Sequence, residues 1–514
     1  MKLLVEPKAK DELKSAAILC AKLRSTGILH GMEAEFKRAY YYDPVAFIHD
    51  CFWWPSGQRS ADYQDEICSM IIEKKRVAAR GPHGPGKTAL AAWLTLWFSL
   101  TRDGEDWKVV TTASAWRQLT HYLWPEIHKW SRKLKWKKMG RRLFSSISEL
   151  MTLSLKLDTG EAFAVASNLP ELIEGAHADH LLYIFDEAKA IPDKTFDAAE
   201  GAFIGVGSNI GIEAYALAIS TPGEPQGRFH DIHSRKPGYE DWWVRHITID
   251  ETLRAGRVSQ EWVEQRKAQW GENSSVYQNR VLGEFAISQE SGIIPLSWVE
   301  AAIENWYELA NANNGEYDKI GVDIGGGVGK TVLAFRQGLV ITNLMYLDYS
   351  DMMEIAGHIA SKLRSGAKAV IDVIGMGSGV VHRLREQGYD IDAFNAAGAT
   401  SLKDQSGELG FINKRSAAWW RMRELLDPAN KEKVALPPDD RLIGDLTSVK
   451  MERITSSGKI QIEAKEDIRK RLGRSTDAGD AVIMALWEEG IDLPAYGLSV
   501  EREVSRGEGR RLWR

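Results

Sequence analysis

The stretch Gly81-Pro82-His83-Gly84-Pro85-Gly86-Lys87-Thr88 decides the fold of the first half of this 514-residue chain. It matches the pattern G-x-x-x-x-G-K-[S/T] in full, with a short apolar run before it (76–80) and a long one after it (88–100). Between a strand and a helix, this pattern forms a loop whose backbone N–H groups converge on phosphate oxygens. The stretch therefore predicts a nucleoside triphosphate site in an α/β domain.

Each position of this phosphate-binding loop (the P-loop) has a physical task. Lys87 is expected to reach the β and γ phosphates, and the Thr88 hydroxyl to ligate Mg²⁺. Arg80, directly before the loop, either adds positive charge near the triphosphate or pairs with a neighbouring acid. Three glycines let the backbone approach the phosphate oxygens: Gly81, Gly84 and Gly86.

Two acids at the end of an apolar run supply the second part of a nucleotide hydrolase. Residues 181–185 predict a buried strand, and Asp186 and Glu187 follow it. Hydrolysis requires one carboxylate that supports Mg²⁺ and a second that polarises the attacking water. We expect Asp186 to take the metal role and Glu187 to act as general base.

Two polar segments accompany these residues. The run 214–220 predicts a strand ending in Ser220 and Thr221. These hydroxyls either sense the γ-phosphate and couple hydrolysis to movement, or only cap the end of the strand. Tyr63 and Gln64 lie on a predicted helix before the loop, where the Gln64 amide is expected to contact adenine.

The first half alternates strands with helices, which is typical of a mainly parallel sheet covered by helices. We assign residues 1–285, including an N-terminal helical lead-in, to this P-loop ATPase domain, and 286–316 to a helical linker. A hairpin is expected around 158–160. The expected strands lie at 76–80, 108–112, 181–185 and 214–220.

From residue 317 the pattern changes to three meandering strands followed by alternating helices and strands. This is the order of a ribonuclease H-like domain and of its actin-like relatives, and order alone does not assign chemistry. We assign residues 317–495 to this domain and 496–514 to a flexible basic tail. The expected elements lie at 319–324, 331–337, 339–349, 352–364, 369–373, 377–387 and 391–395.

Acids at the ends of these elements predict a metal nuclease. Asp323 and Asp372 end two strands that are neighbours in this order, and Asp477 and Asp480 share one face of a late helix. Converging carboxylates can hold two Mg²⁺ or Mn²⁺ ions about 4 Å apart for phosphodiester hydrolysis. The rival interpretation is a nucleotide loop of the actin type at 323–327.

Composition and charge narrow the class of protein. The chain carries 66 Lys and Arg against 71 Asp and Glu and is 44% hydrophobic, which fits a globular protein. No apolar run reaches the roughly 20 residues that span a bilayer, and the N-terminus lacks a signal-peptide core. The three cysteines of the chain have the spacing of neither a disulfide framework nor a zinc site. We expect a cytoplasmic protein without a membrane partner.

One segment, residues 129–142, carries eight basic side chains and no acid, with Trp130 and Trp136 among them. Basic residues of this kind neutralise DNA phosphates while indoles stack. The alternative is a solvated helix face whose two tryptophans belong to the core.

Together these features resemble the large terminase subunit, the DNA-packaging motor of tailed bacteriophages, over roughly residues 40 to 490. The most specific part is the order of an ATPase followed by a metal nuclease. The motifs that carry the resemblance are 80–88, 116–118, 174–180 with Asp186 and Glu187, 281–285, and the acids Asp323, Asp372 and Asp480.

The resemblance implies ATP-driven translocation of double-stranded DNA into a procapsid and cutting of concatemeric DNA by a two-metal endonuclease. ATP and Mg²⁺ are the implied cofactors, with Mn²⁺ as a substitute in the nuclease. The implied partners are DNA, the small terminase subunit, the portal protein and further copies in a ring. The implied location is the cytoplasm of the infected bacterial host, not the mature virion.

The same resemblance carries roles to single residues. Lys87 and Thr88 would bind ATP and Mg²⁺, and Ser220 and Thr221 would form the coupling segment. The implied nuclease ligands are Asp323, Asp372 and Asp480, with Asp477 as a ligand or a neighbour. An arginine finger is implied, and the sequence does not choose between Arg80 and other arginines.

Two other functions fit the same residues. One is a DNA-dependent ATPase and nuclease of repair or defence. The other is a nucleotide-switched adaptor whose second domain is inactive.

Overall fold

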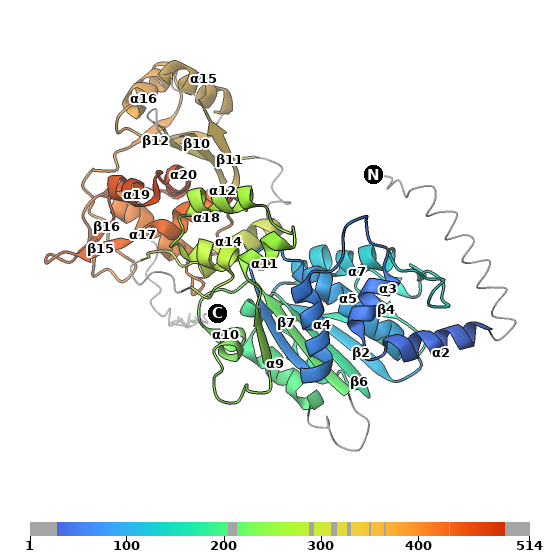
Figure 1. The fold of residues 1–514 in the computed structure, drawn as a ribbon. Helices are drawn as coiled ribbons and strands as arrows, with labels where there is room; N and C mark the ends of the chain where they lie inside the picture. Colours follow the sequence, from blue (N-terminus) through green and yellow to red (C-terminus); the bar gives the residue numbers. More distant parts are fainter. Residues whose placement is uncertain are drawn as a thin grey trace, which may run out of the picture. The chain divides into compact units, whose positions relative to one another are not determined.

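The computed structural model describes residues 28–203, 213–286, 292–309, 316–325, 330–348, 351–363, 366–430 and 432–488 (Figure 1). The chain divides into two compact units, Met1–Glu300 and Ala301–Arg514. This division falls inside the expected linker, 286–316. The start of the N-terminal lead-in, before residue 28, and the expected tail, 496–514, lie outside the described residues.

The first unit is built on an eight-stranded sheet in the order β3-β4-β5-β2-β6-β7-β1-β8. All pairs from β5 to β8 are parallel, and β3 and β4 add an antiparallel edge. The strands are β1 (Arg76–Arg80), β2 (Trp107–Ala113), β3 (Leu150–Met151), β4 (Ser154–Lys156), β5 (Gly160–Ala166), β6 (His180–Asp186), β7 (Glu213–Ser220) and β8 (Trp243–His246). The expected parallel sheet is therefore present, and the hairpin expected at 158–160 joins β4 to β5.

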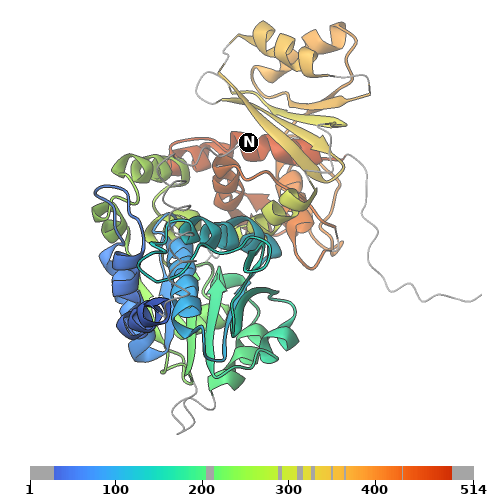
Figure 2. The ribbon, with the colours of Figure 1, turned by 90° about the vertical axis from the view of Figure 1, so that its right-hand side faces the viewer.

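Helices cover both faces of this sheet because successive strand residues point to opposite sides. In β7, Tyr215, Leu217 and Ile219 pack into one hydrophobic cluster, whereas Ala214, Ala216 and Ala218 pack into the other. The first cluster lies under α2 (Ile28–Tyr40), α3 (Pro44–Cys51), α4 (Asp62–Lys74), α5 (Lys87–Arg102) and α7 (Trp124–Ser131). The second lies under α8 (Pro170–Glu174), α9 (Asp193–Glu200) and α10 (Gly227–His233). The sheet is thus the middle layer of three (Figure 2).

Helix α5 is the apolar run that follows the P-loop, and every residue from Leu90 to Arg102 is buried. A helix buried on all sides belongs in the core of a domain. Its first residue is Lys87, so the packing of α5 fixes the place of this lysine.

Short helical elements complete the first unit after β2, after β6 and beyond β8. They are α6 (Trp116–Gln118), η1 (Leu119–Leu123), η2 (Ala188–Ala190), η3 (Gly201–Phe203), α11 (Ile249–Arg254), α12 (Gln260–Trp270), α13 (Ser275–Tyr277) and η4 (Gln278–Leu282). Helix α14 (Leu296–Leu309) begins in the first unit and continues into the second.

The second unit contains a five-stranded sheet in the order β11-β10-β9-β12-β13. Strand β10 is antiparallel to β9 and β11, whereas β12 and β13 run parallel to β9. This is the predicted ribonuclease H-like order. The strands are β9 (Lys319–Asp323), β10 (Thr331–Gln337), β11 (Val340–Leu347), β12 (Lys368–Asp372) and β13 (Ile391–Phe394).

Helices α15 (Met352–Lys362) and α16 (Gly377–Glu386) share a hydrophobic cluster with this sheet. Helix α20 (Asp477–Leu486) packs closely on β9, because a Cβ built on Gly321 would lie 2.1 Å from the carbonyl oxygen of Ala481. A side chain at position 321 would therefore push α20 away from the sheet.

The sequence did not predict a second, three-stranded sheet in this unit, in the order β14-β16-β15. It is accompanied by α17 (Lys414–Leu426), α18 (Asp440–Ser448) and α19 (Lys465–Leu472). Its strands are β14 (Gly410–Phe411), β15 (Met451–Ile454) and β16 (Lys459–Ile462). Among the helices of both units that the structure describes, none is long and apolar enough to cross a membrane.

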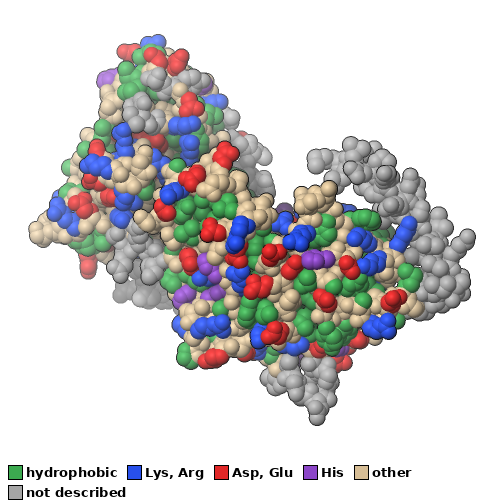
Figure 3. Space-filling view, viewed as in Figure 1, with side chains coloured by type: hydrophobic (Ala, Val, Ile, Leu, Met, Phe, Trp, Pro, Cys, Tyr) green, Lys and Arg blue, Asp and Glu red, His purple; other side chains and the backbone are tan. Residues whose placement is uncertain are grey.

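The basic segment 129–142 is folded into the first unit. Trp130 and Trp136 are buried, as the core interpretation required. Four of its basic residues pair with acids: Lys129 with Glu126, Lys138 with Asp50, Arg141 with Glu33 and Asp103, and Arg142 with Glu149. On the face drawn in Figure 3, basic and acidic side chains are intermixed.

Candidate functional site

The P-loop joins the carboxyl end of β1 to the first turn of α5. Gly84 and Gly86 adopt φ values of +88° and +83°, a left-handed conformation that favours glycine. A Cβ on Gly86 would also lie 2.8 Å from Nε2 of Gln64. The backbone conformation therefore favours glycine at position 86, and a larger residue there would also displace the Gln64 amide.

Lys87 lies over this loop. Its Nζ donates hydrogen bonds to the carbonyl oxygens of Pro82 (2.7 Å) and Gly81 (3.3 Å), and to the Thr221 hydroxyl (3.0 Å). Burial lowers the pKa of Lys87 to about 8, against the opposing effect of the nearby carboxylates of Glu187 and Asp186. The loop lysine therefore contacts the predicted coupling segment directly.

Asp186 and Glu187 follow β6 at the same edge of the sheet. Burial, and then the charge of Glu187, raise the pKa of Asp186 to about 7. Glu187 has a φ of +49°, so the backbone turns sharply at the proposed base. Its Oε2 accepts a hydrogen bond from Ser220 Oγ at 3.1 Å. Ser220 thus contacts the proposed base, as Thr221 contacts Lys87.

Arg80 and Gln64 both support the P-loop region. The Arg80 guanidinium donates to the carbonyl oxygen of Gly283 and pairs with Glu284, so of the two interpretations the structure shows the acid pair. The Gln64 amide donates to the Gly86 carbonyl (3.1 Å) and accepts from the Ala61 N–H (2.9 Å). The Gln64 amide, which was expected to contact adenine, is therefore hydrogen-bonded to the backbone of Gly86 and Ala61.

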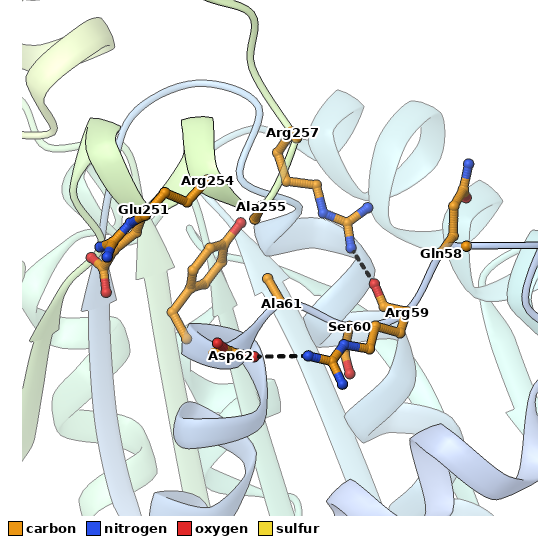
Figure 4. A pocket seen from close by; sticks show the side chains of 12 residues that line it. Gln58, Arg59, Ser60, Ala61, Asp62, Glu251, Arg254, Ala255 and Arg257 are labelled. Carbon is orange, nitrogen blue, oxygen red and sulfur yellow. Dashed lines mark hydrogen bonds and ion pairs between the residues drawn. The ribbon is translucent and has the colours of Figure 1, made fainter.

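A polar cavity of about 620 Å³ lies in the first unit (Figure 4). Its walls are residues 57–63, Glu251 and residues 254–257. The Tyr63 hydroxyl donates to the Pro85 carbonyl at 2.8 Å, which joins this cavity to the P-loop. Arg257 donates to the carbonyl oxygen of Arg59 at 2.7 Å and links the two walls. No sequence motif marks residues 251–257, so this wall of the cavity was not predicted.

In the second unit, three of the four predicted acids surround one lysine, Lys465. Its Nζ lies 3.1 and 3.0 Å from the two carboxylate oxygens of Asp323 and 3.0 Å from Oδ2 of Asp480. Asp477 Oδ1 is 3.9 Å away. Asp372 ends the neighbouring strand β12, and the charges of Lys465 and Asp480 affect its pKa, which burial raises above the usual value.

Other side chains hold these acids in place. Asp480 accepts hydrogen bonds from the indole of Trp419 and the hydroxyl of Thr476, both at 2.9 Å. The buried Asp445 of α18 accepts the backbone N–H groups of Ala478 (2.9 Å) and Gly479 (3.0 Å) at the start of α20. The acids of α20 are therefore fixed by neighbours that no sequence motif marks.

Lys465 shows that a cation fits among these carboxylates. In the described part of the chain, no three His, Cys, Asp or Glu side chains form a ready-made metal site. The Lys465 ammonium instead stands where oxygens of two carboxylates converge. An all-oxygen donor set suits Mg²⁺ or Mn²⁺ rather than zinc, which prefers nitrogen and sulfur ligands.

Comparisons with known proteins point in one direction. No protein-family model matches the sequence. The chain is 25% identical over 500 residues to a probable terminase large subunit of Enterobacteria phage P7, covering 91% of this chain and 95% of that protein. The resemblance that the sequence motifs indicated is therefore confirmed along nearly the whole chain.

Two similar solved structures are also large terminases. That of the thermophilic bacteriophage D6E aligns with a TM-score of 0.39 at 14% identity, covering 84% of this chain and all of that one. The nuclease domain of the large terminase subunit of bacterial virus Sf6 aligns with a TM-score of 0.32 at 21% identity, covering 38% of this chain and 98% of that one.

Proposed function

We propose that this chain is the large subunit of a bacteriophage terminase, which hydrolyses ATP to move double-stranded DNA into a procapsid and cuts concatemeric DNA. One observation carries the proposal. A P-loop with its Asp186 and Glu187 pair lies in the first unit, and carboxylates that converge on a cation lie in a separate, ribonuclease H-like unit. The related phage P7 protein, similar over nearly its full length, supports this combination.

In the ATPase unit, Lys87 would bind the β and γ phosphates, and Thr88 and Asp186 would hold Mg²⁺. Glu187 would accept a proton from the attacking water. The hydrogen bond from Ser220 orients this carboxylate, and Thr221 holds Lys87 at the loop. Ser220 and Thr221 are adjacent in the chain. A movement of this segment would therefore change both the Ser220–Glu187 and the Lys87–Thr221 hydrogen bonds.

In the nuclease unit, Asp323, Asp372 and Asp480 would hold two divalent ions, with Asp477 beside them. Such ions, when bound, activate the attacking water and stabilise charge on the scissile phosphate. Trp419 and Thr476 orient the Asp480 carboxylate for this task. Contacts with metal and backbone phosphate carry little base information, so cutting would be largely independent of sequence.

The remaining partners follow from the proposed role. The chain would act with a small terminase subunit and a portal protein, as a ring of copies on the portal, in the cytoplasm of the infected bacterium. A function in repair or defence and an adaptor role are less favoured, because the phage P7 relative matches both units in order.

Plasmid cleavage and phosphate release from ATP test the proposal together. We compare wild type with Asp323→Ala, Lys87→Ala and Glu187→Gln, in Mg²⁺ and in Mn²⁺. Asp323→Ala should abolish cleavage and retain ATP hydrolysis. Lys87→Ala and Glu187→Gln should do the reverse, with a loss of about 10²-fold or more in hydrolysis for Glu187→Gln. Equal cleavage by Asp323→Ala would refute the nuclease assignment.

A further inference from the structure

Two basic side chains of the first unit meet on one carboxylate, that of Glu300 in α14. The Lys189 Nζ lies 3.1 and 3.0 Å from the two oxygens of Glu300, and Arg280 donates to Oε1 at 3.4 Å. Burial raises the pKa of Glu300, but the charges of Lys189 and Arg280 outweigh it and hold the pKa below its usual value. Glu300 is therefore an ionised partner of both cations.

Lys189 lies close to the P-loop lysine and to the coupling segment. It follows Glu187 by two residues, in the short helical turn η2. Its Cδ would lie 3.2 Å from a Cβ on Gly223, just beyond Thr221, the residue that bonds Lys87. The positive charge of Lys189 also lowers the pKa of Lys87, in the same direction as burial does.

Arg280 is tied to the P-loop through its backbone. Its carbonyl oxygen accepts the N–H of His83 at 2.8 Å. Gly283, three residues later, is packed so closely that a Cβ there would lie 2.9 Å from the backbone of Gly81. Arg280 therefore contacts the loop with its main chain while its guanidinium bonds Glu300.

Helix α14 extends from this ion cluster into the second unit. Beyond Glu300, the side chain of Asn305 donates to the Val434 carbonyl at 3.0 Å, and the indole of Trp306 donates to the Ile341 carbonyl at 2.9 Å. One helix thus carries the carboxylate that pairs with Lys189 and Arg280, and further along it carries side chains that donate hydrogen bonds within the second unit.

We propose that Glu300 competes with the γ-phosphate of ATP for Lys189 and Arg280, so that ATP releases the start of α14 and ADP leaves it bound. This inference rests on the proposed function, because it requires ATP at the P-loop. Both cations exchange one anionic partner for another, and no covalent bond changes. The two states of α14 then differ in contacts that only a triphosphate supplies, which is what a ligand-driven switch requires.

The test measures binding of ATPγS and of ADP, with Mg²⁺, to the full chain by calorimetry. Amide hydrogen exchange of residues 292–309 is followed in the same states. In wild type, ATPγS should raise exchange at the start of α14 relative to ADP. Glu300→Gln should raise the affinity for ATPγS about fivefold or more, leave the affinity for ADP unchanged, and raise exchange in every state.

Glu308→Gln is the matched control, because Glu308 lies on the same helix and pairs with Lys433 at 3.7 Å in an exposed contact. It should change neither affinity. Lys189→Met is the second variant and should reduce the ATPγS affinity towards that for ADP. If Glu300→Gln fails to fold, the ATPγS affinity of Lys189→Met still tests the proposal.

The outcomes separate the inference from the proposed function. Wild type that binds neither nucleotide would refute the proposed function itself. Wild type that binds ATPγS, with an unchanged ratio of ATPγS to ADP affinity in Glu300→Gln or unchanged ATPγS binding in Lys189→Met, would overturn only the role of Glu300.

Discussion

Lys465 is the residue on which the acids of the second unit converge. Its ammonium contacts Asp323 and Asp480 and neutralises part of their mutual repulsion. Like charges held this close destabilise a fold unless a cation lies between them. Lys465 and a divalent ion are therefore alternative partners for the same oxygens.

Replacing Lys465 with methionine should consequently strengthen metal binding. We expect the variant to have a lower melting temperature than wild type in EDTA and a larger rise on adding Mn²⁺, with a higher Mn²⁺ affinity by calorimetry. Lys470→Met is the control, since Lys470 pairs with Asp467 in an exposed contact away from these carboxylates. Weaker Mn²⁺ binding in Lys465→Met would mean that the lysine assists the metal instead of competing with it.

At the scale of elements, the start of α20 depends on a carboxylate from α18. Asp445 accepts two backbone N–H groups there, which would otherwise be buried without partners. Losing such an acceptor costs about 1–3 kcal/mol. Asp445→Ala should lower the free energy of unfolding by that amount and weaken metal binding, whereas Asp445→Asn, which keeps an oxygen acceptor, should lose less.

The Asp445 carboxyl should also make the free energy of unfolding depend on pH. Burial raises the pKa of Asp445 to about 6, above the value of about 4 expected in the unfolded chain. A raised folded pKa means that its stabilising contribution is full below pH 4 and is lost as the pH passes 6. Relative to Asp445→Asn, wild type should therefore lose stability between pH 4 and 6, as denaturation in urea would measure. A pH-independent difference would contradict this assignment.

The basic segment 129–142 offers a second prediction at this scale. Among the described ion pairs of this segment, Lys129 and Lys138 pair with acids, whereas Lys133, Lys135 and Lys137 do not, and Lys135 donates instead to the backbone carbonyl of Asp50. Replacing the first three with alanine should weaken DNA binding and reduce its salt slope by up to about 3. Replacing Lys129 and Lys138 should have less effect. Equal effects of the two sets would show that the segment does not select phosphates through these lysines.

The elements also show what a sequence can predict. Strands β1 and β10 have the expected bounds, because each is a short apolar run between clear turn signals. Strand β8 was missed because its four residues are only half-buried and lack an alternating pattern. Lys465 was missed because its partner Asp323 lies 142 positions away, and no local spacing marks that contact.

For the whole molecule, two compact units with separate hydrophobic cores should unfold in separate steps. A ligand stabilises only the unit that binds it. We expect calorimetry to show two transitions: at constant Mg²⁺, adding ATPγS should raise one of them through the P-loop, whereas without nucleotide, adding Mn²⁺ to metal-free protein should raise the other. Lys87→Ala should remove the first shift and leave the second, and a single transition raised equally by both ligands would contradict independent units.

Gly321 affects the size of the ion that the carboxylates of the second unit can hold. It lies on β9, two residues before Asp323, and its lack of a side chain lets α20 approach the sheet. Oxygen ligands lie at about 2.0–2.1 Å from Mg²⁺ and at about 2.3–2.6 Å from Ca²⁺. An alanine at position 321 would widen the gap between Asp323 and Asp480, and the ratio of Ca²⁺ to Mg²⁺ affinity should rise. A residue without any ligand atom would then set which ion the carboxylates prefer.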